Sequence, residues 1–312
     1  MKIVCLLPFA FCFFNSFSQT CCIEWQKCLG GSNDDFGSVV RQTADGGYIA
    51  CGYTWSSDGD VSGLHQSLGV YCDAWLVKTD SAGNILWQKC RGGSYGDGFF
   101  DVRTTTDSGY IAAGFTWSND FDVSGNHGVA GAQSDFWITK LDSAGELIWQ
   151  KCFGGSGDDE AKMVQQTPDG GYIVAGTTFS NDGDALGSHG DFDALVFRLD
   201  SAGNILWHKC LGGTEEEKIQ TVEQEADGGF IFSIFTKSND GDVSGNHGFG
   251  DAWFVKTDSS GNMVWQRCIG GNYDDNAAAF SRTADGGFIL TGHSGSDDSI
   301  FTSCNGVNNF DF

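Results

Sequence analysis

The feature that most constrains the fold of this chain is a repeat anchored on tryptophan. Five segments read "WQKC" or a close variant, and they begin at Trp25, Trp87, Trp149, Trp207 and Trp265. Their spacings are 62, 62, 58 and 58 residues. A repeat of this kind is one supersecondary unit that buries its core against its neighbours. The chain is therefore predicted to consist of about five equivalent units.

Each unit contains four short extended runs. In the first unit they span residues 38–43, 48–55, 74–80 and 85–90, and the turn sequences "ADGG" and "SAGN" separate the first pair and the last pair. The runs are rich in β-branched and aromatic residues and show no sustained helical period. Four short antiparallel strands repeated at this length are typical of propeller blades. We therefore predict an all-β propeller of four-stranded antiparallel blades, with about five blades in this chain.

Two segments carry a resemblance to a known group. "GGSGDDEAKMVQQTPDGGYIVAGTT" and "DSAGNILWQKC" resemble secreted bacterial β-propeller repeat proteins, which are often exported with a type IX secretion sorting domain. The likeness covers residues 22–312. "DSAGNILW" is also similar to the tryptophan docking motif of quinoprotein propellers, with one residue fewer between Asp and Trp. The resemblance implies a propeller fold and an extracellular location, and it assigns no functional residue.

The two ends of the chain give further expectations. Residues 1–18 are predicted to be a secretory signal, because Lys2 precedes a short apolar run and Ser16 and Ser18 form a small-x-small cleavage site. The propeller domain then spans 19–312, and we expect an exported monomer without a membrane span. The last unit stops inside its third strand, and "CIEWQKC" near the N-terminus reads as a lone fourth strand. Both closure of a five-bladed ring by this strand and truncation of a longer chain fit this pattern.

The acidic composition limits the partners. The formal net charge is −24, with 41 Asp and Glu against 17 Lys and Arg. Nucleic acids and anionic membranes would be repelled. Metal cations, basic proteins and neutral glycans remain as partners, although an acidic surface also simply keeps a protein soluble.

The cysteines fall into a repeated slot and a few other positions. The slot after each "WQK" is expected to hold small buried thiols, because equivalent slots in successive units lie too far apart for a disulfide. These residues are Cys28, Cys90, Cys152, Cys210 and Cys268. Cys51 with Cys72, and Cys304 with Cys21 or Cys22, are candidate pairs, whereas Cys5 and Cys12 lie in the signal.

An acidic loop recurs between the second and third runs. It reads "SSDGDVSGLH", "SNDFDVSGNHG", "SNDGDALGSHG" and "SNDGDVSGNHG", beginning at Ser56, Ser118, Ser180 and Ser238. The connection from each fourth run to the next first run is also acidic, as in "GGSGDD" and "GGTEEE". Antiparallel order places both connections at one end of the blade and both tight turns at the other. A ring of carboxylates is therefore predicted around one mouth of the propeller.

The spacing of oxygen-bearing residues in this loop suggests calcium. Asp240, Asp242, Ser244 and Gly245 match positions 1, 3, 5 and 6 of a calcium loop, and Asp251 stands at position 12. Leu186 replaces the serine in the third unit, and four extra residues lengthen the loop in the first two. The candidate metal ligands are Asp58, Asp60, Ser62, Asp120, Asp122, Ser124, Asp182, Asp184, Asp193, Asp240, Asp242, Ser244 and Asp251. Asp-Gly-Asp is also an ordinary turn sequence, so both interpretations stay open.

Histidines and aromatic residues accompany the loop. His65, His127, His189 and His247 lie seven residues after the first loop aspartate. They suit either a zinc or manganese site or, as we expect, packing over the loop. Trp55, Trp117 and Phe179 end the second run beside the loop and are candidates for sugar stacking, or for plugs between blades. Trp75, Trp137 and Trp253, inside the third run, are assigned to the core.

The repetition argues against catalysis. An acid and a base must be held at different pKa values, whereas these loops are near-copies. We predict a secreted, non-catalytic propeller that presents its acidic face to a protein or a glycan, with calcium as a stabilising ion. The alternative is a carbohydrate-active enzyme that uses the same face, with Glu215, Glu216 and Glu217 as glycosidase candidates. A stalk or spacer is a third possibility.

Overall fold

The computed structural model describes residues 23–65, 70–283 and 285–296, and it is almost entirely β-structure. Four sheets have four antiparallel strands each, in the order of the sequence, and a fifth has two. Their only helical element among the described residues is a 3-10 turn, η1 (Gly183–Ala185). The prediction of an all-β propeller with four-stranded antiparallel blades is confirmed.

The strands follow the four predicted runs of each unit. Blade 1 comprises β1 (Asp35–Gln42), β2 (Tyr48–Thr54), β3 (Asp73–Thr79) and β4 (Ile85–Arg91). Blade 2 comprises β5 (Asp97–Thr104), β6 (Tyr110–Thr116), β7 (Asp135–Leu141) and β8 (Leu147–Phe153). Blade 3 comprises β9 (Asp159–Gln166), β10 (Tyr172–Thr178), β11 (Asp193–Leu199) and β12 (Ile205–Leu211). Blade 4 comprises β13 (Glu217–Gln224), β14 (Phe230–Thr236), β15 (Asp251–Thr257) and β16 (Met263–Ile269), and the last sheet pairs β17 (Asp275–Arg282) with β18 (Phe288–Ser294).

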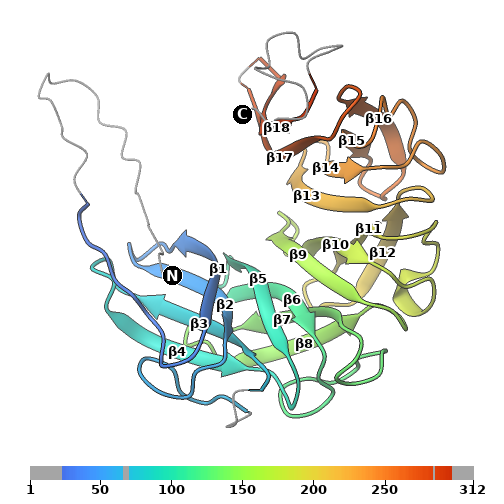
Figure 1. Cartoon of the computed structure of the whole chain (residues 1–312). Helices are drawn as coiled ribbons and strands as arrows, with labels where there is room; N and C mark the ends of the chain where they lie inside the picture. The colour runs from blue at the N-terminus through green and yellow to red at the C-terminus, as the bar shows by residue number, and fades with distance from the viewer. Residues whose placement is uncertain (1–22, 66–69, 284, 297–312) are drawn as a thin grey trace, which may run out of the picture.

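The blades stand side by side along an arc (Figure 1). The first strand of each blade lies on the inside of the arc and the fourth strand on the outside. Neighbouring blades pack through their inner strands: β5 contacts β1 and β2, and β9 contacts β5 and β6. The inner wall is therefore formed by β1, β5, β9, β13 and β17.

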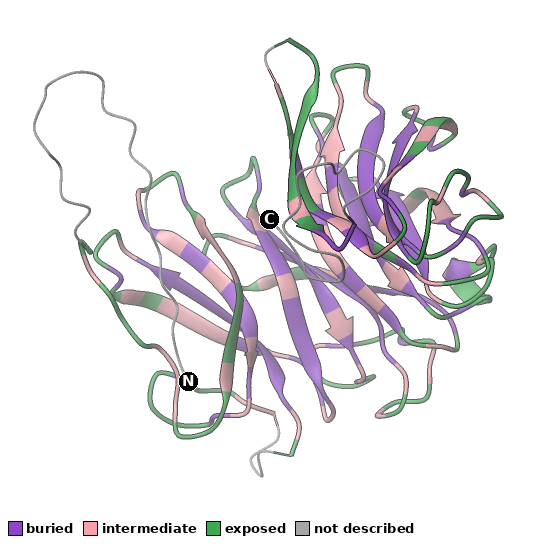
Figure 2. Ribbon diagram, turned by 45° about the horizontal axis from the view of Figure 1, so that its top comes forward, coloured by how far each residue is buried: buried purple, intermediate pink, exposed green. Residues whose placement is uncertain are grey.

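The core lies between the sheets, because each sheet is covered on both faces. All seven residues of β7 are buried, although their side chains alternate between the two faces. Trp137 and Phe99, both of blade 2, stack with ring centroids 4.9 Å apart in one cluster with Ile49 of blade 1, and Phe153 of blade 2 stacks on Phe197 of blade 3 at the same distance. Figure 2 shows the buried residues concentrated where sheets face one another. The assignment of Trp75, Trp137 and Trp253 to the core is confirmed.

The repeated tryptophans join each blade to the next. The Trp87 ring meets Tyr110 edge-on at 5.7 Å, and a Cβ on Gly145 would come within 2.9 Å of the same ring. Trp149 and Trp207 make the equivalent contacts with the blades that follow them. Glycine is thus required in the "SAGN" and "SAGE" turns because the indole occupies the space of a side chain.

Two sequence expectations differ from the structure. Trp25 does contact Tyr48 like the other tryptophans, but residues 23–34 form no strand, because no third strand of another blade lies beside them in the described part of the chain. The Cys51–Cys72 pair is wrong: all seven described cysteines are free thiols. Cys51 lies opposite Leu76 in the β2–β3 register, so Cys72 falls four residues out of reach. Burial raises the pKa of the Cys72 and Cys90 thiols to about 12.

The predicted signal and the incomplete last strand lie outside the described residues, as do Cys5, Cys12, Cys21, Cys22 and Cys304. In the described part of the chain, no helix has the length and apolar character needed to cross a bilayer.

Candidate functional site

The two acidic connections of each unit interlock at one end of the blades, which we call the loop mouth. Asp60 N–H donates to Gly30 C=O at 3.0 Å, and Ser32 N–H donates to the Asp58 carboxylate at 2.7 Å. Equivalent backbone bonds join Asp122 to Gly92, Asp184 to Gly154 and Asp242 to Gly212. The prediction that both acidic connections share one face is confirmed. The opposite end, formed by the "ADGG"-type and "SAGN"-type turns, is the turn mouth.

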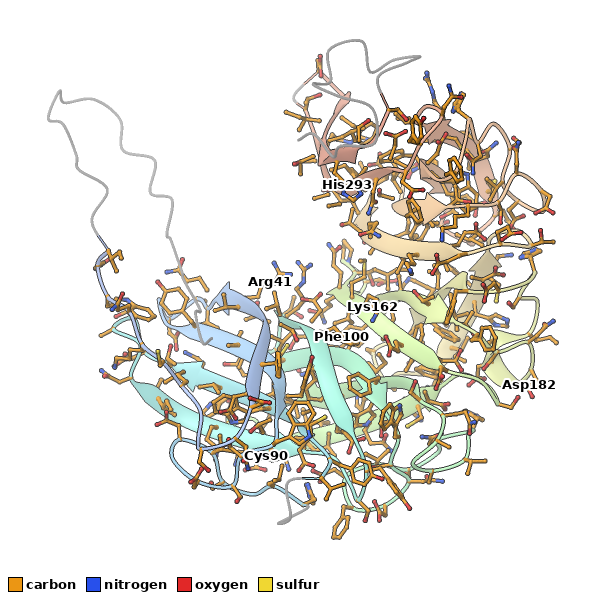
Figure 3. The ribbon with its side chains drawn as sticks, in the orientation of Figure 1. Arg41, Cys90, Phe100, Lys162, Asp182 and His293 are labelled. Carbon is orange, nitrogen blue, oxygen red and sulfur yellow. The ribbon has the colours of Figure 1, made fainter. Side chains whose placement is uncertain are left out.

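The first aspartate of each acidic loop clips the loop to the neighbouring connection. Asp240 accepts Thr214 N–H at 2.9 Å and the Thr214 hydroxyl at 2.8 Å, while Asp182 accepts Ser156 N–H at 2.7 Å. These hydrogen bonds lower the pKa of both carboxyl groups. Figure 3 places Asp182 well outside the inner strands. The residue expected at calcium position 1 therefore already has protein donors.

The loop serines contact the outer strand of their own blade. Ser62 and Ser124 hydroxyls accept from Gln88 and Gln150 at 2.6 and 2.7 Å. In the third unit leucine replaces the serine and histidine replaces the glutamine, and His208 instead contacts Leu186 C=O at 3.4 Å. This paired replacement is a sequence signal for the contact, and sequence reasoning missed it.

The candidate calcium ligands of one loop thus each have a different partner. Asp193 and Asp251, the expected closing ligands, are fully buried at the first position of β11 and β15 and bind the loop histidine. Among the described residues, no group of three or more His, Cys, Asp and Glu side chains is arranged to hold a metal ion. Calcium binding by these loops stays a prediction.

The loop histidines connect one blade to the next. His65 Nδ1 lies 2.6 Å from the buried Asp73 carboxylate of its own blade, and Nε2 lies 3.8 Å from Asp122 of blade 2. His127 repeats this between Asp135 and Asp184, at 2.6 and 3.8 Å. Hydrogen bonding to Asp73 raises the pKa of His65. The expected packing role of these histidines thus takes the form of a bridge between two carboxylates.

A buried acid supports the loops from beneath, and sequence reasoning did not single it out. Asp159 accepts Gly155 N–H and the Ser180 hydroxyl, both at 2.8 Å, as well as the Thr178 hydroxyl. Burial raises its pKa to about 6, and burial raises the pKa of Asp97 to about 7. The sequence does show a pattern that could have identified this acid, because an acidic residue begins the inner strand of every unit. These residues are Asp35, Asp97, Asp159, Glu217 and Asp275.

Blades 1 and 2 carry an aromatic cluster at the loop mouth, and it contains two of the predicted sugar-binding residues. Its six rings are Phe36, Tyr53, Trp55, Phe100, Phe115 and Trp117. Tyr53 and Phe115 link the blades with centroids 6.2 Å apart, and Phe36 is 50% exposed. Phe179 stands apart and packs on Phe192. Sequence reasoning missed the four phenylalanine and tyrosine rings, because alternation within a strand makes them look like core residues.

Charged side chains stand at several of the equivalent positions in blades 3 and 4. Lys162 Nζ lies over the Phe100 ring at 3.9 Å (Figure 3). Glu216 pairs with Lys218 at 2.5 Å and Lys237 at 2.8 Å. Partial burial opposes the shift, but these two lysines lower the pKa of Glu216. A carboxyl group held ionised in this way is poorly suited to donate a proton to a leaving group.

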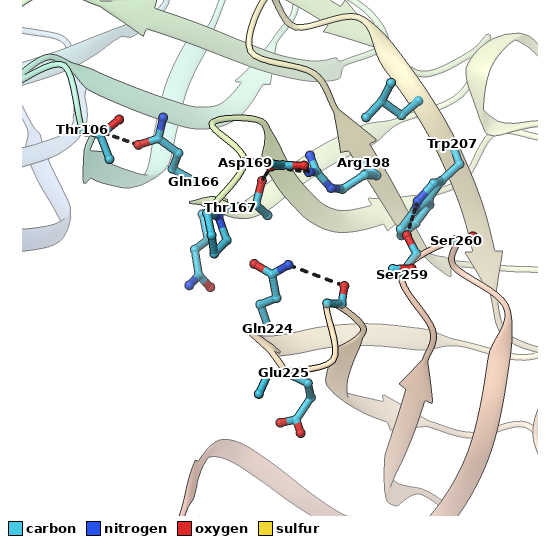
Figure 4. Close-up of a pocket in the computed structure, with 15 residues that line it drawn as sticks. Thr106, Gln166, Thr167, Asp169, Arg198, Trp207, Gln224, Glu225, Ser259 and Ser260 are labelled. Atoms are coloured by element: carbon cyan, nitrogen blue, oxygen red, sulfur yellow. Dashed lines mark hydrogen bonds and ion pairs between the residues drawn. The ribbon is translucent and has the colours of Figure 1, made fainter.

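Two hollows open at the turn mouth, where sequence reasoning placed no site. One of about 530 Å³ lies at the inner wall between β1, β5 and β9. The other, of about 850 Å³, lies between blades 3 and 4 (Figure 4). Thr106, Gln165 and Gln166 line both, so the hollows adjoin.

No protein-family model and no curated protein matches this chain. Among solved structures, it is similar to a protein of unknown function from Bacteroides caccae, with 14% identity, 79% of this chain and 86% of that chain covered, and a TM-score of 0.31. Two variants of B. megaterium levansucrase align at 10% and 12% identity, each over 75% of this chain and 68% of that chain, with TM-scores of 0.32 and 0.33.

Proposed function

We propose that this β-propeller is an exported, non-catalytic binding protein that holds a neutral glycan at its loop mouth. The observation that carries the proposal is the six-ring aromatic cluster of blades 1 and 2 beside the acidic loops. Aromatic rings offer a stacking surface, and carboxylates accept hydrogen bonds from sugar hydroxyl groups. Trp55 and Trp117 are only partly buried, so their rings are available to a ligand.

The glycosidase alternative has weak support from its candidate residues. Glu216 is ion-paired with two lysines, and Glu217 is buried and accepts bonds from Thr236 and Gly213. Both carboxyl groups thus serve the local structure. The repeated loop carboxylates are clips and bridges with equivalent surroundings, whereas acid–base catalysis needs two groups in different surroundings.

We also propose that the acidic loops bind calcium weakly. Backbone N–H groups already bind the first aspartate of each loop, so a cation must compete for the same oxygens. We therefore expect affinities in the millimolar range that extracellular calcium modules show.

The test is an array of neutral glycans probed with the full chain and with a Trp55→Ala, Trp117→Ala variant. A stacking ring contributes roughly 1–1.5 kcal/mol, which is about tenfold in affinity. We expect the double variant to lose binding. The matched control is Leu86→Ala with Ile148→Ala, which removes exposed apolar side chains from the outer strands β4 and β8.

Three results would contradict the proposal. Absence of binding to every neutral glycan would remove the ligand class. Binding to basic proteins, with none to glycans, would show that the acidic face recognises a protein partner. Hydrolysis of a glycoside by the wild-type chain, lost in Glu216→Gln, would support the glycosidase alternative instead.

A further inference from the structure

The smaller hollow at the turn mouth gathers positive charge in an acidic protein. Its lining contains two guanidinium groups and no carboxylate, and the residues are Arg41, Gln42, Arg103, Thr104, Thr105, Thr106, Gln165 and Gln166. The whole chain has only 17 Lys and Arg against 41 Asp and Glu. Two arginines from different blades therefore create a local positive charge, although the protein as a whole would repel an anion.

A buried aspartate holds both guanidinium groups in place. Asp101, 4% exposed, accepts Arg41 Nη2 at 3.0 Å, Arg103 Nε at 3.1 Å and the backbone N–H of Val164 at 3.2 Å. These partners come from blades 1, 2 and 3. Two guanidinium groups share one carboxylate, so a net positive charge remains. Arg41 Nε is buried and has no hydrogen-bond partner among the described residues.

These residues occupy slots that vary from blade to blade. The slot of Asp101 holds Val39, Met163, Thr221 and Ala279 in the other inner strands. The slot of Arg41 and Arg103 holds Gln165, Glu223 and Ser281 in the others. Residues that maintain a blade recur in every unit, as the buried acid at the first position does. The cluster around Asp101 occurs at one place only among the described residues, so the blades do not need it to fold.

The larger hollow continues from this cluster toward the outer strand β12. Figure 4 shows Gln166 near one end and Trp207 near the other, where the indole N–H donates to Ser259 C=O at 3.0 Å, and Gln224 of blade 4 lies between them. Its charged groups are paired: Arg198 Nη2 contacts Asp169 at 2.6 Å, and Glu225 binds Arg282. Pro168, Leu206 and the Trp207 indole add apolar surface. Amides, hydroxyl groups and an indole in one hollow suit a polyhydroxylated ligand.

We propose that the two hollows form one binding site for an acidic oligosaccharide. The carboxylate of a uronic acid residue binds Arg41 and Arg103, and the following sugar rings extend along Gln166 and Gln224 toward Trp207. Guanidinium groups recognise carboxylates through paired, charge-assisted hydrogen bonds. This site shares no residue with the loop mouth, so it stands whether or not the loop mouth binds a glycan.

The test is calorimetric titration of the full chain with trigalacturonate and with a neutral galactose trisaccharide. Each variant removes charge-assisted hydrogen bonds to the ligand carboxylate, so Arg41→Gln and Arg103→Gln are each expected to weaken trigalacturonate binding at least tenfold. Arg91→Gln is the matched control, because Arg91 pairs with Glu146 on the outside of the arc. The neutral trisaccharide is expected to bind at least tenfold more weakly than trigalacturonate to the wild-type chain.

A pair of variants at exposed leucines tests the same site if the arginine variants fail to fold. Leu206 and Leu86 occupy the same slot in blades 3 and 1, and both are 58% exposed. Leu206→Glu places a negative charge in the site and is expected to weaken trigalacturonate binding, whereas Leu86→Glu is expected to leave it unchanged.

Three outcomes would overturn the proposal. One is no heat of binding with millimolar trigalacturonate. Another is equal binding by the wild-type chain, Arg41→Gln and Arg103→Gln, or equal effects of Leu206→Glu and Leu86→Glu. A triglutamate peptide that binds as tightly as trigalacturonate would assign the cluster to acidic peptides instead.

Discussion

Raising the pH from 5.5 to 8 is expected to destabilise this protein, although many proteins are stable across that range. The pKa of the buried Asp97 is raised from 3.8 to about 7. A carboxyl group with a raised folded-state pKa binds its proton more tightly in the folded chain than in the unfolded chain. Its contribution to stability is therefore lost as the pH rises toward the folded-state pKa.

The magnitude follows from the same shift. Each pH unit below the folded-state pKa corresponds to about 1.4 kcal/mol, so ionising Asp97 between pH 5.5 and 8 costs about 2 kcal/mol. Asp159, whose pKa is about 6, adds less than about 1 kcal/mol over that range. The raised pKa of His65 acts in the same direction, because its stabilisation is present in the protonated form and is lost at higher pH.

The assay is urea unfolding at pH 5.5 and pH 8, followed by tryptophan fluorescence. The free energy of unfolding is expected to fall by about 2–3 kcal/mol for the wild-type chain. Asp97→Asn removes the titrating group and should abolish most of that difference, whatever its effect on stability at either pH. Asp80→Asn is the control, since Asp80 is held by Asn84 in a turn and its pKa is lowered. A free energy that rises between pH 5.5 and 8, or an unchanged difference in Asp97→Asn, would refute the reasoning.

The remaining predictions concern the loops and the turns. Millimolar calcium is expected to raise the melting temperature by several degrees, and Asp240→Ala with Asp242→Ala should reduce the rise by removing one of the four loops; no rise at millimolar calcium would leave the loops as plain turns. Gly171→Ala is expected to cost more than Gly170→Ala in thermal unfolding, because a Cβ on Gly171 would lie 2.3 Å from Leu199 C=O whereas one on Gly170 meets nothing. Gly170 has φ +87°, so Gly170→Ala should lower the free energy of unfolding by about 1 kcal/mol. Equal losses of stability in the two variants would contradict this account.

Local and periodic features of the sequence predicted the fold well. Four extended runs per repeat, tight turns and acidic connections fixed the blades and the loop mouth, because strand alternation depends only on neighbouring residues. The Cys51–Cys72 pair failed because it depends on a β-strand register that spacing does not define. The loop aspartates fit both plain turns and calcium loops, because Asx turns and calcium loops need the same side chains at the same spacing, so the sequence does not decide between the two.

The inner wall was beyond the reach of the same reasoning. Arg41 and Asp101 are 60 residues apart, and they meet only because β1 and β5 lie side by side on the inside of the arc. An aspartate at the slot of Asp101, where the other inner strands have uncharged side chains, was visible in the sequence. It gained meaning only once the first strand of each blade was known to be innermost.

The tryptophan and histidine contacts give the array of blades a direction. Each unit offers an indole and an imidazole at one side, and a glycine turn and a loop carboxylate at the other. The indole–glycine and imidazole–carboxylate contacts of this head-to-tail joint recur between blades 1 and 2, 2 and 3, and 3 and 4. A chain from which one whole unit of 62 residues is excised would rejoin through the same indole–glycine and imidazole–carboxylate contacts, so recombination can lengthen or shorten this protein while keeping the contacts that recur at each joint.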